Sequence, residues 1–252
     1  MMGRTHAITG VAAGMALFWD AQVAHGPLDL GPIQVPAGST HLGLGLGSMS
    51  APYTALMCLA LACTALLPDL DTPSSLASTS IPPLTGWVSG RLAAAGHRKV
   101  THSGVGIAVG AGLAAAVSVW VVGTDIPVRP GNGLLLGLCA AIGARAGGVG
   151  PHQRLLLWAA AASGTLMGAA LPATSWWFAP ASVAVGMWVH RIGDALTTQG
   201  VENLLWPVVR GPRLCVPLLG PTGSNREQAL AGAAAAYAAW CGADLLLAAV
   251  RM

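Results

Sequence analysis

The chain has 252 residues, of which 54% are hydrophobic and only 8% are charged, and its formal net charge is +3. The mean hydropathy of +0.64 excludes an ordinary soluble protein, and no basic run interleaved with aromatic residues indicates nucleic-acid binding. We therefore expect an integral membrane protein that folds as a single membrane-embedded domain over residues 1–252. The 34 glycines are typical of helices that pack closely in lipid.

Apolar stretches predict an all-α protein, a polytopic helical bundle with about seven membrane helices. The stretches cover residues 5–19, 51–67, 104–122, 133–146, 155–171, 176–190 and 229–250. Several are shorter than the roughly 20 residues that a full crossing needs, so five or six crossings are alternatives. Ser224 and Glu227 have the spacing of a capping box before the last stretch. The Gly- and Pro-rich residues 20–50 are predicted to form a flexible loop.

Charge placement predicts the orientation. If each stretch crosses once, one side receives ten of the Lys and Arg residues and the other receives two. The first side carries Arg4, Arg91, Arg98, Lys99, Arg145, Arg154, Arg191, Arg210, Arg213 and Arg226, and the second carries Arg129 and Arg251. Because cytoplasmic loops collect positive charge, we expect the N-terminus in the cytoplasm of a bacterial inner membrane and the C-terminus outside.

Two carboxylates, Asp69 and Asp71, follow directly after the second apolar stretch. Pro68 and Pro73 flank them and hold the backbone out of a regular helix. Carboxylates at the end of an apolar helix need cations, protons or hydrogen-bond donors nearby, because a desolvated charge is otherwise very unfavourable.

The predicted topology brings metal-type ligands from four segments to the same cytoplasmic side. His190 and Asp194 are four residues apart, which places them on one helical face. The complete candidate set is His6, Asp69, Asp71, His97, His102, His190 and Asp194. Imidazole and carboxylate together suit zinc, manganese or iron better than calcium, and we favour zinc.

Simpler interpretations exist for each residue taken alone. His6 is compatible with a histidine at a helix start, His190 with a hydrogen-bonded core residue, and Asp69 and Asp71 with caps. Arg98 and Lys99 would serve as topology determinants. Convergence of seven such residues on one membrane face favours a single site over independent structural roles.

A set of motifs in a fixed order carries a resemblance to a known family. The motifs are Thr5-His6, Pro68-Asp69-Leu70-Asp71 with Pro73-Ser74-Ser75, His97-Arg98 with Thr101-His102-Ser103, His190-Arg191-Ile192-Gly193-Asp194 with Leu196-Thr197, Gly200, and Leu205-Trp206-Pro207. They resemble those of the YdjM family of membrane-bound metal-dependent hydrolases, which is distantly similar to zinc-dependent phospholipase C. Thr72 departs from the pattern, because members often carry a histidine there.

The sequence therefore predicts a metal-dependent hydrolase of a phosphoester or phospholipid-like substrate at the cytoplasmic membrane interface. Asp69 and Asp71 are the candidate catalytic carboxylates, with Asp71 as a bridging ligand if two ions are present and one carboxylate as general base. Arg98 and Lys99, joined by Arg191, are expected to hold the phosphate. Two alternatives are a non-catalytic membrane scaffold with a structural metal site and a small transporter.

Overall fold

Eight α-helices form most of the protein, and the computed structural model describes residues 1–29, 31–32, 34–120, 129–209 and 211–250. The helices are α1 (Gly3–Phe18), α2 (Ala51–Thr64), α3 (Leu84–Ala94), α4 (Gly104–Ser118), α5 (Pro130–Ala146), α6 (Arg154–Ala169), α7 (Phe178–Ala195) and α8 (Asn225–Val250). Each predicted stretch falls on one of them, which confirms a mainly helical protein. Positions 121 and 122 of the third stretch, and Arg210 and Arg251, lie outside the described residues.

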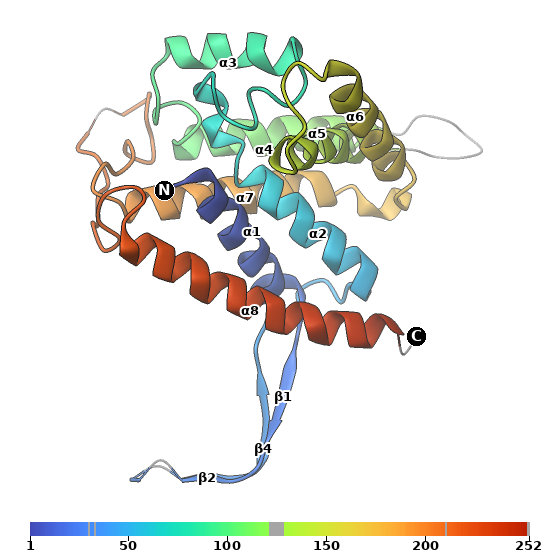
Figure 1. Ribbon diagram of the computed structural model, residues 1–252, viewed down its shortest axis with the longest axis vertical. Helices are drawn as coiled ribbons and strands as arrows, with labels where there is room; N and C mark the ends of the chain where they lie inside the picture. The colour runs from blue at the N-terminus through green and yellow to red at the C-terminus, as the bar shows by residue number, and fades with distance from the viewer. Residues whose placement is uncertain (30, 33, 121–128, 210, 251–252) are drawn as a thin grey trace.

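The helices pack around α7, α2 and α1 (Figure 1). α1 contacts α2, α7 and the long α8, whereas α4 packs on α7, and α5 pairs with α6. Buried side chains from α2, α5 and α7, among them Met57, Leu61, Leu136 and Phe178, form the largest apolar core cluster. This core joins α2, α5 and α7 to each other and also includes Phe18 at the end of α1.

Small residues allow the close approach of several helices. At Gly10 of α1 an added Cβ would lie 2.6 Å from the carbonyl oxygen of Leu61 in α2. At Gly186 of α7 it would overlap the Thr64 hydroxyl, and that hydroxyl donates to the Ser182 carbonyl at 2.8 Å. Because real Cβ atoms do not approach so closely, these helix pairs depend on glycine, as the composition indicated.

The segment between α1 and α2 contains a β-hairpin and is not the flexible loop that we predicted. β1 (Gln22–His25) pairs antiparallel with β4 (Gly38–His41), and β2 (Leu28–Asp29) pairs with β3 (Gln34–Val35) at the tip. The ribbon protrudes from the helices on the side where α1 ends (Figure 1). Gly and Pro residues separate the short strands here, and because they are abundant the strand pattern was not recognised in the sequence.

Helix α3 is an addition to the predicted stretches. It follows a 3-10 helix, η1 (Pro68–Asp71), and several turns, and lies apart from the main bundle while contacting η1 (Figure 1). Its Trp87 side chain is 62% exposed, with the Arg91 guanidinium 5.1 Å from the ring centroid. This exposed aromatic–cation pair is compatible with a position at a membrane surface.

Within the part of the chain that the structure describes, two helical segments are long and apolar enough to cross a membrane, Ala51–Asp71 and Asn225–Val250, and the shorter Gly104–Ser118 is also apolar. Only 11% of the apolar window of Asn225–Val250 is buried. Its Trp240 and Leu246 side chains are exposed, and so are Leu155 and Leu166 on α6. An outer surface of this kind is typical of contact with lipid.

Candidate metal centre

Four chain segments meet at the end of the bundle where α1 starts. η1 extends the end of α2 as a short 3-10 turn, as expected for a backbone with Pro68 at its first position. The turn before α4 ends at the N-cap Ser103, whose hydroxyl accepts a hydrogen bond from the Gly106 N–H at 2.9 Å. The last two turns of α7 carry His190 and Asp194, and the first turn of α1 carries His6.

The centre of this cluster is a contact between two buried imidazoles. The Nε2 atoms of His102 and His190 are 2.9 Å apart. The Nδ1 atom of His190 lies 2.7 Å from the Ala65 carbonyl oxygen, which only accepts, so Nδ1 carries the proton and Nε2 presents a lone pair. The Nδ1 atom of His102 lies 3.3 Å from a carboxylate oxygen of Asp71, which fixes the same tautomer. With both Nδ1 atoms engaged by acceptors, the two Nε2 atoms face each other, and a cation or a proton between them stabilises the contact.

Asp194 completes the cluster with negative charge. One carboxylate oxygen, Oδ2, lies 3.5 Å from the Nε2 atom of His102 and 3.6 Å from that of His190. The other, Oδ1, lies 3.2 Å from the Nε2 atom of His6 and also contacts the Met1 ammonium. The His6 ring stacks on that of His190 with centroids 3.6 Å apart, and its Nδ1 atom is buried without a hydrogen-bond partner.

Five of the seven predicted metal residues come together in two groups that could hold a metal ion. One consists of His6, His190 and Asp194, and the other of Asp69, His102 and His190. Within each group the ligand atoms lie within 4.8 Å of one another, and His190 belongs to both. The donor set of imidazoles and carboxylates and the partnerless Nδ1 of His6 fit a transition-metal ion.

Asp71 and His97 belong to neither group, and the structure places them one layer further out. The Asp71 carboxylate accepts hydrogen bonds from the Arg98 N–H at 3.0 Å and the Thr101 hydroxyl at 2.8 Å, and it contacts the Nδ1 atom of His97 at 2.7 Å. These partners occupy both of its oxygens, which face the Nδ1 side of His102, away from His190. Thr72 donates to Asp71 at 3.3 Å and is likewise in neither group.

The predicted phosphate-binding cations differ in their surroundings. The Arg98 guanidinium is buried, with Nε 3.1 Å from Asp194 and Nη1 3.2 Å from the Gly200 carbonyl oxygen. Arg98 also has a positive φ of 61°, which turns the chain between His97 and His102. Arg191 is buried and donates to the carbonyl oxygens of His102 and Glu202. In contrast, half-buried Lys99 makes no ion pair with any residue that the structure describes.

The charges at His102 favour a cation in this centre. Burial alone would lower the pKa of the His102 imidazole, but hydrogen bonding to Asp194 and Asp71 outweighs it and raises the pKa above the ordinary value. The carboxylates therefore attract positive charge to the cluster, which a proton or a metal ion supplies.

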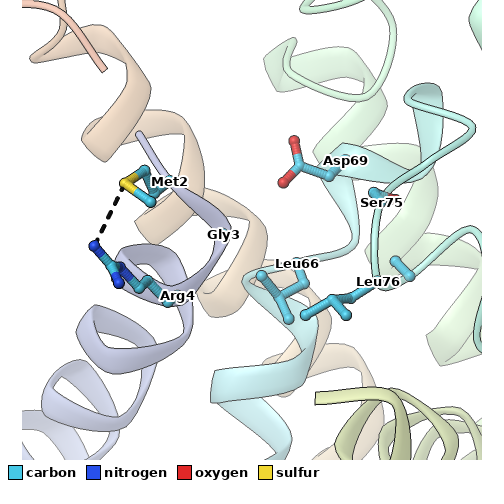
Figure 2. A pocket seen from close by; sticks show the side chains of 8 residues that line it. Met2, Gly3, Arg4, Leu66, Asp69, Ser75 and Leu76 are labelled. Atoms are coloured by element: carbon cyan, nitrogen blue, oxygen red, sulfur yellow. Dashed lines mark hydrogen bonds between the residues drawn. The ribbon is translucent and has the colours of Figure 1, made fainter. Parts of the chain in front are cut away.

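A pocket of about 350 Å³ opens beside the cluster. It is bounded by the first residues of α1 and by the chain from the end of α2 to residue 77, and the Asp69 carboxylate projects toward it (Figure 2). The Asp69 side chain is 24% exposed, whereas those of His102, His190 and Asp194 are almost completely buried. Asp69 therefore belongs to the second ligand group and also lines the pocket, so it connects the pocket to the cluster.

Comparison with known families agrees with this description. The family model described as YdjM inner membrane protein matches residues 1–250. The chain belongs to the YdjM inner membrane protein family. Together with the apolar helices, membership in YdjM identifies it as a membrane protein. No curated protein and no solved structure matches the chain.

Some residues at the centre carry no strong signal in the sequence of this YdjM member. The Ala65 carbonyl oxygen fixes the His190 tautomer, and a backbone atom leaves no trace in residue type. Thr101 links Asp71 to His102, with its hydroxyl 3.0 Å from the Nδ1 atom of His102. Its place in the His97–Ser103 motif was the one available signal.

Proposed function

We propose that this protein is a polytopic inner-membrane hydrolase that depends on a divalent metal ion and cleaves a phosphoester at the cytoplasmic interface. The observation that carries the proposal is the pair of imidazole lone pairs that face each other at 2.9 Å beside the Asp194 carboxylate. Membrane lipid surrounds the protein, and a lipid or small-molecule phosphoester is its substrate. No nucleic acid takes part.

His6, Asp69, His102, His190 and Asp194 would hold the ion, and zinc suits this mixture of donors best. A divalent ion in such a site supplies positive charge that polarises a phosphoryl group and lowers the pKa of water toward neutrality. Asp71 would orient His102 and not bridge two ions, because protein donors already occupy its oxygens.

The reaction is hydrolysis at phosphorus. A water oxygen forms the new P–O bond, the ester P–O bond breaks, and the departing alkoxide takes up a proton, so that an alcohol and a phosphate are released. Asp69 meets the pocket and is our candidate to accept the proton of the attacking water. Lys99 is available to hold phosphate charge, whereas Arg98 and Arg191 position Asp194 and the His102 backbone.

Accessibility favours a catalytic site over a structural one. A structural zinc site is closed by protein ligands, and a catalytic site keeps a position for water. Here Asp69 is partly exposed and lines a pocket. Among the described residues, the buried ionisable side chains gather at one end of the bundle, which favours an enzyme over a transporter.

Elemental analysis of the purified protein tests the metal, and a panel of phospholipids and polyprenyl phosphates tests turnover. We expect one or two equivalents of a transition metal in the wild type and a loss of it in His102→Ala and His190→Ala. The matched control is His152→Ala, because His152 is exposed and outside both ligand groups. Absence of a tightly bound transition metal from the wild type refutes the proposal. Bound metal without turnover of any phosphoester supports the scaffold alternative.

A further inference from the structure

The pocket beside Asp69 has a mixed lining that points to its ligand. Its polar side chains come from Arg4, Asp69 and Ser75, and Leu66, Leu76 and Ala77 supply an apolar wall. Figure 2 shows Asp69 on the side of the pocket opposite Met2 and Arg4, with Leu66 and Leu76 side by side below it. Charged side chains of opposite sign therefore face the pocket from two sides, and a third part of its lining is apolar.

Arg4 lines the pocket and has donor groups available for an anion, and Figure 2 shows its guanidinium turned toward the Met2 sulfur at the rim. Its side chain is exposed, its Nη2 atom contacts only the sulfur of Met2 at 3.8 Å, and it makes no ion pair with a described residue. Arg98 and Arg191, in contrast, are buried and hydrogen-bonded to the protein. A guanidinium with free donors is well suited to a phosphate or carboxylate.

The apolar wall lies where the hydrocarbon part of an amphiphile would enter. Leu66 follows the apolar run of α2, which belongs to one of the candidate membrane spans, and Leu76 and Ala77 pack with it in a small apolar cluster. A volume of about 350 Å³ is near the lower limit for ligand pockets, so it fits a phosphate and a few carbons. The rest of a long chain would have to lie outside, against the apolar surface of the helices.

We propose that this pocket binds an alkyl phosphate, with the phosphoryl group between Arg4 and the metal centre and the first carbons against Leu66, Leu76 and Ala77. The proposal rests on the proposed function, since an anion beside Asp69 is favourable only when a cation neutralises that carboxylate. The alkyl phosphate is either the head of a membrane lipid or a soluble ester, and the chemistry that the pocket recognises is the same.

Calorimetry with methyl-, propyl- and pentylphosphonate tests the pocket, because their C–P bond is not hydrolysed. The zinc-loaded protein is used in detergent, and elemental analysis of each sample reports its metal content. Each methylene that enters the apolar wall should tighten binding up to about fourfold. Arg4→Gln should weaken binding about tenfold with unchanged metal content, because a charge-assisted hydrogen bond is lost. Arg154→Gln is the matched control, as Arg154 is also exposed in the first turn of a helix but lies on α6.

Gly3→Leu provides a second variant that should fold. An added Cβ at Gly3 would meet only the Cδ2 atom of Leu66 at 3.6 Å, an ordinary contact, so the larger side chain extends into the pocket. We expect it to abolish pentylphosphonate binding and to retain the wild-type metal content. Equal affinities for Arg4→Gln and Arg154→Gln, or pentylphosphonate binding to Gly3→Leu at wild-type strength, would overturn the pocket assignment.

Pentylphosphonate binding also distinguishes the two sources of the alkyl phosphate, a membrane lipid and a soluble ester. Competition by phosphatidic acid in phosphatidylcholine nanodiscs assigns the pocket to a membrane lipid, and binding without such competition assigns it to a soluble ester; either result supports the pocket. A wild type that binds no metal refutes the proposed function and, with it, the anion site that depends on a bound cation. Normal metal content with binding independent of Arg4 refutes the pocket alone.

Discussion

At the scale of single residues, hydrogen bonds on the outer nitrogens prepare the centre for a cation. The Nδ1 atoms of His102 and His190 are engaged by Asp71 and by the Ala65 carbonyl, so both Nε2 atoms present lone pairs to the same point. Partners of this kind fix the orientation of metal-binding histidines and raise their basicity. Asp71 therefore affects cation binding indirectly, by orienting His102.

Asp71→Asn tests this indirect role. The amide keeps the shape of the side chain but is a weaker acceptor, so we expect metal affinity to fall about 10- to 100-fold. His102→Ala, which removes a ligand, should abolish tight binding. The measurement is competition for zinc with a chelator of known affinity. Thr72→Val is the control, since it removes only the 3.3 Å hydrogen bond to Asp71 and a 3.2 Å contact with His97, both outside the ligand groups, and should have little effect. An Asp71→Asn effect as large as that of His102→Ala would make Asp71 a direct ligand.

Sequence patterns predicted most residues of the cluster, but they did not distinguish the possible ligands from the residues that only position those ligands. Topology and the four-residue spacing of His190 and Asp194 predicted that these side chains converge with His6 and His102, and they do. From residue type alone we predicted that Asp71 binds the metal directly and that Arg98 binds the phosphate directly. Their partners, the Arg98 N–H and the Gly200 carbonyl oxygen, are backbone atoms placed by tertiary structure, which no local pattern encodes.

At the scale of elements, the α5–α6 pair depends most clearly on glycine. An added Cβ at Gly164 would overlap the carbonyl oxygen of Leu136, and one at Gly168 would overlap that of Asn132. The facing carbonyl oxygens belong to backbone, which does not move aside as a flexible side chain would. Close approach of the two helices thus fixes α6 against the bundle.

Gly164→Ala should therefore destabilise the protein by about 1–3 kcal/mol, the usual cost of overpacking. Gly143→Ala is the matched control on α5, because an added Cβ there meets nothing within 4 Å. It should be neutral or stabilising by up to ~1 kcal/mol through helix propensity. The apparent melting temperature in detergent at a fixed scan rate reports both changes. Equal melting temperatures for the two variants would contradict the observed helix packing.

Apolar periodicity predicted helices well where they are long and uninterrupted, and poorly elsewhere. Helix α8 begins at Asn225, and the Ser224 hydroxyl accepts from the Glu227 N–H at 3.1 Å, as the capping box predicts. Glu227 itself reaches the N–H groups of Gly223 and Met2, a contact between distant parts of the chain. The hairpin and α3 were not predicted, because the Gly and Pro residues of the hairpin segment and Gly86 and Gly90 of α3 interrupt short patterns of other residues.

At the scale of the whole molecule, α1 connects the two polar features. The candidate metal centre lies at its start, and the β-hairpin extends from its end (Figure 1). If α1 crosses the membrane, the centre and the hairpin face opposite compartments. The distribution of Lys and Arg then predicts that the centre faces the cytoplasm and the hairpin the outside.

Cysteine labelling tests this orientation with a native probe. Cys215 is exposed, and its sulfur contacts the Thr197 carbonyl oxygen at 3.3 Å, close to the end of α7 that carries Asp194. Ser39 in β4 is also exposed. We expect a membrane-impermeant maleimide to label Ser39→Cys, made in a Cys215→Ser background, in intact spheroplasts but not in inside-out vesicles.

Wild-type Cys215 should show the opposite pattern, and detergent should make both positions reactive. Cys58, Cys139 and Cys241 are buried, so they contribute little to the signal. Labelling of Cys215 in spheroplasts together with protection of position 39 would reverse the orientation and place the centre outside the cell. Labelling of both positions from one side would show that α1 does not cross, because its two ends would then share a compartment.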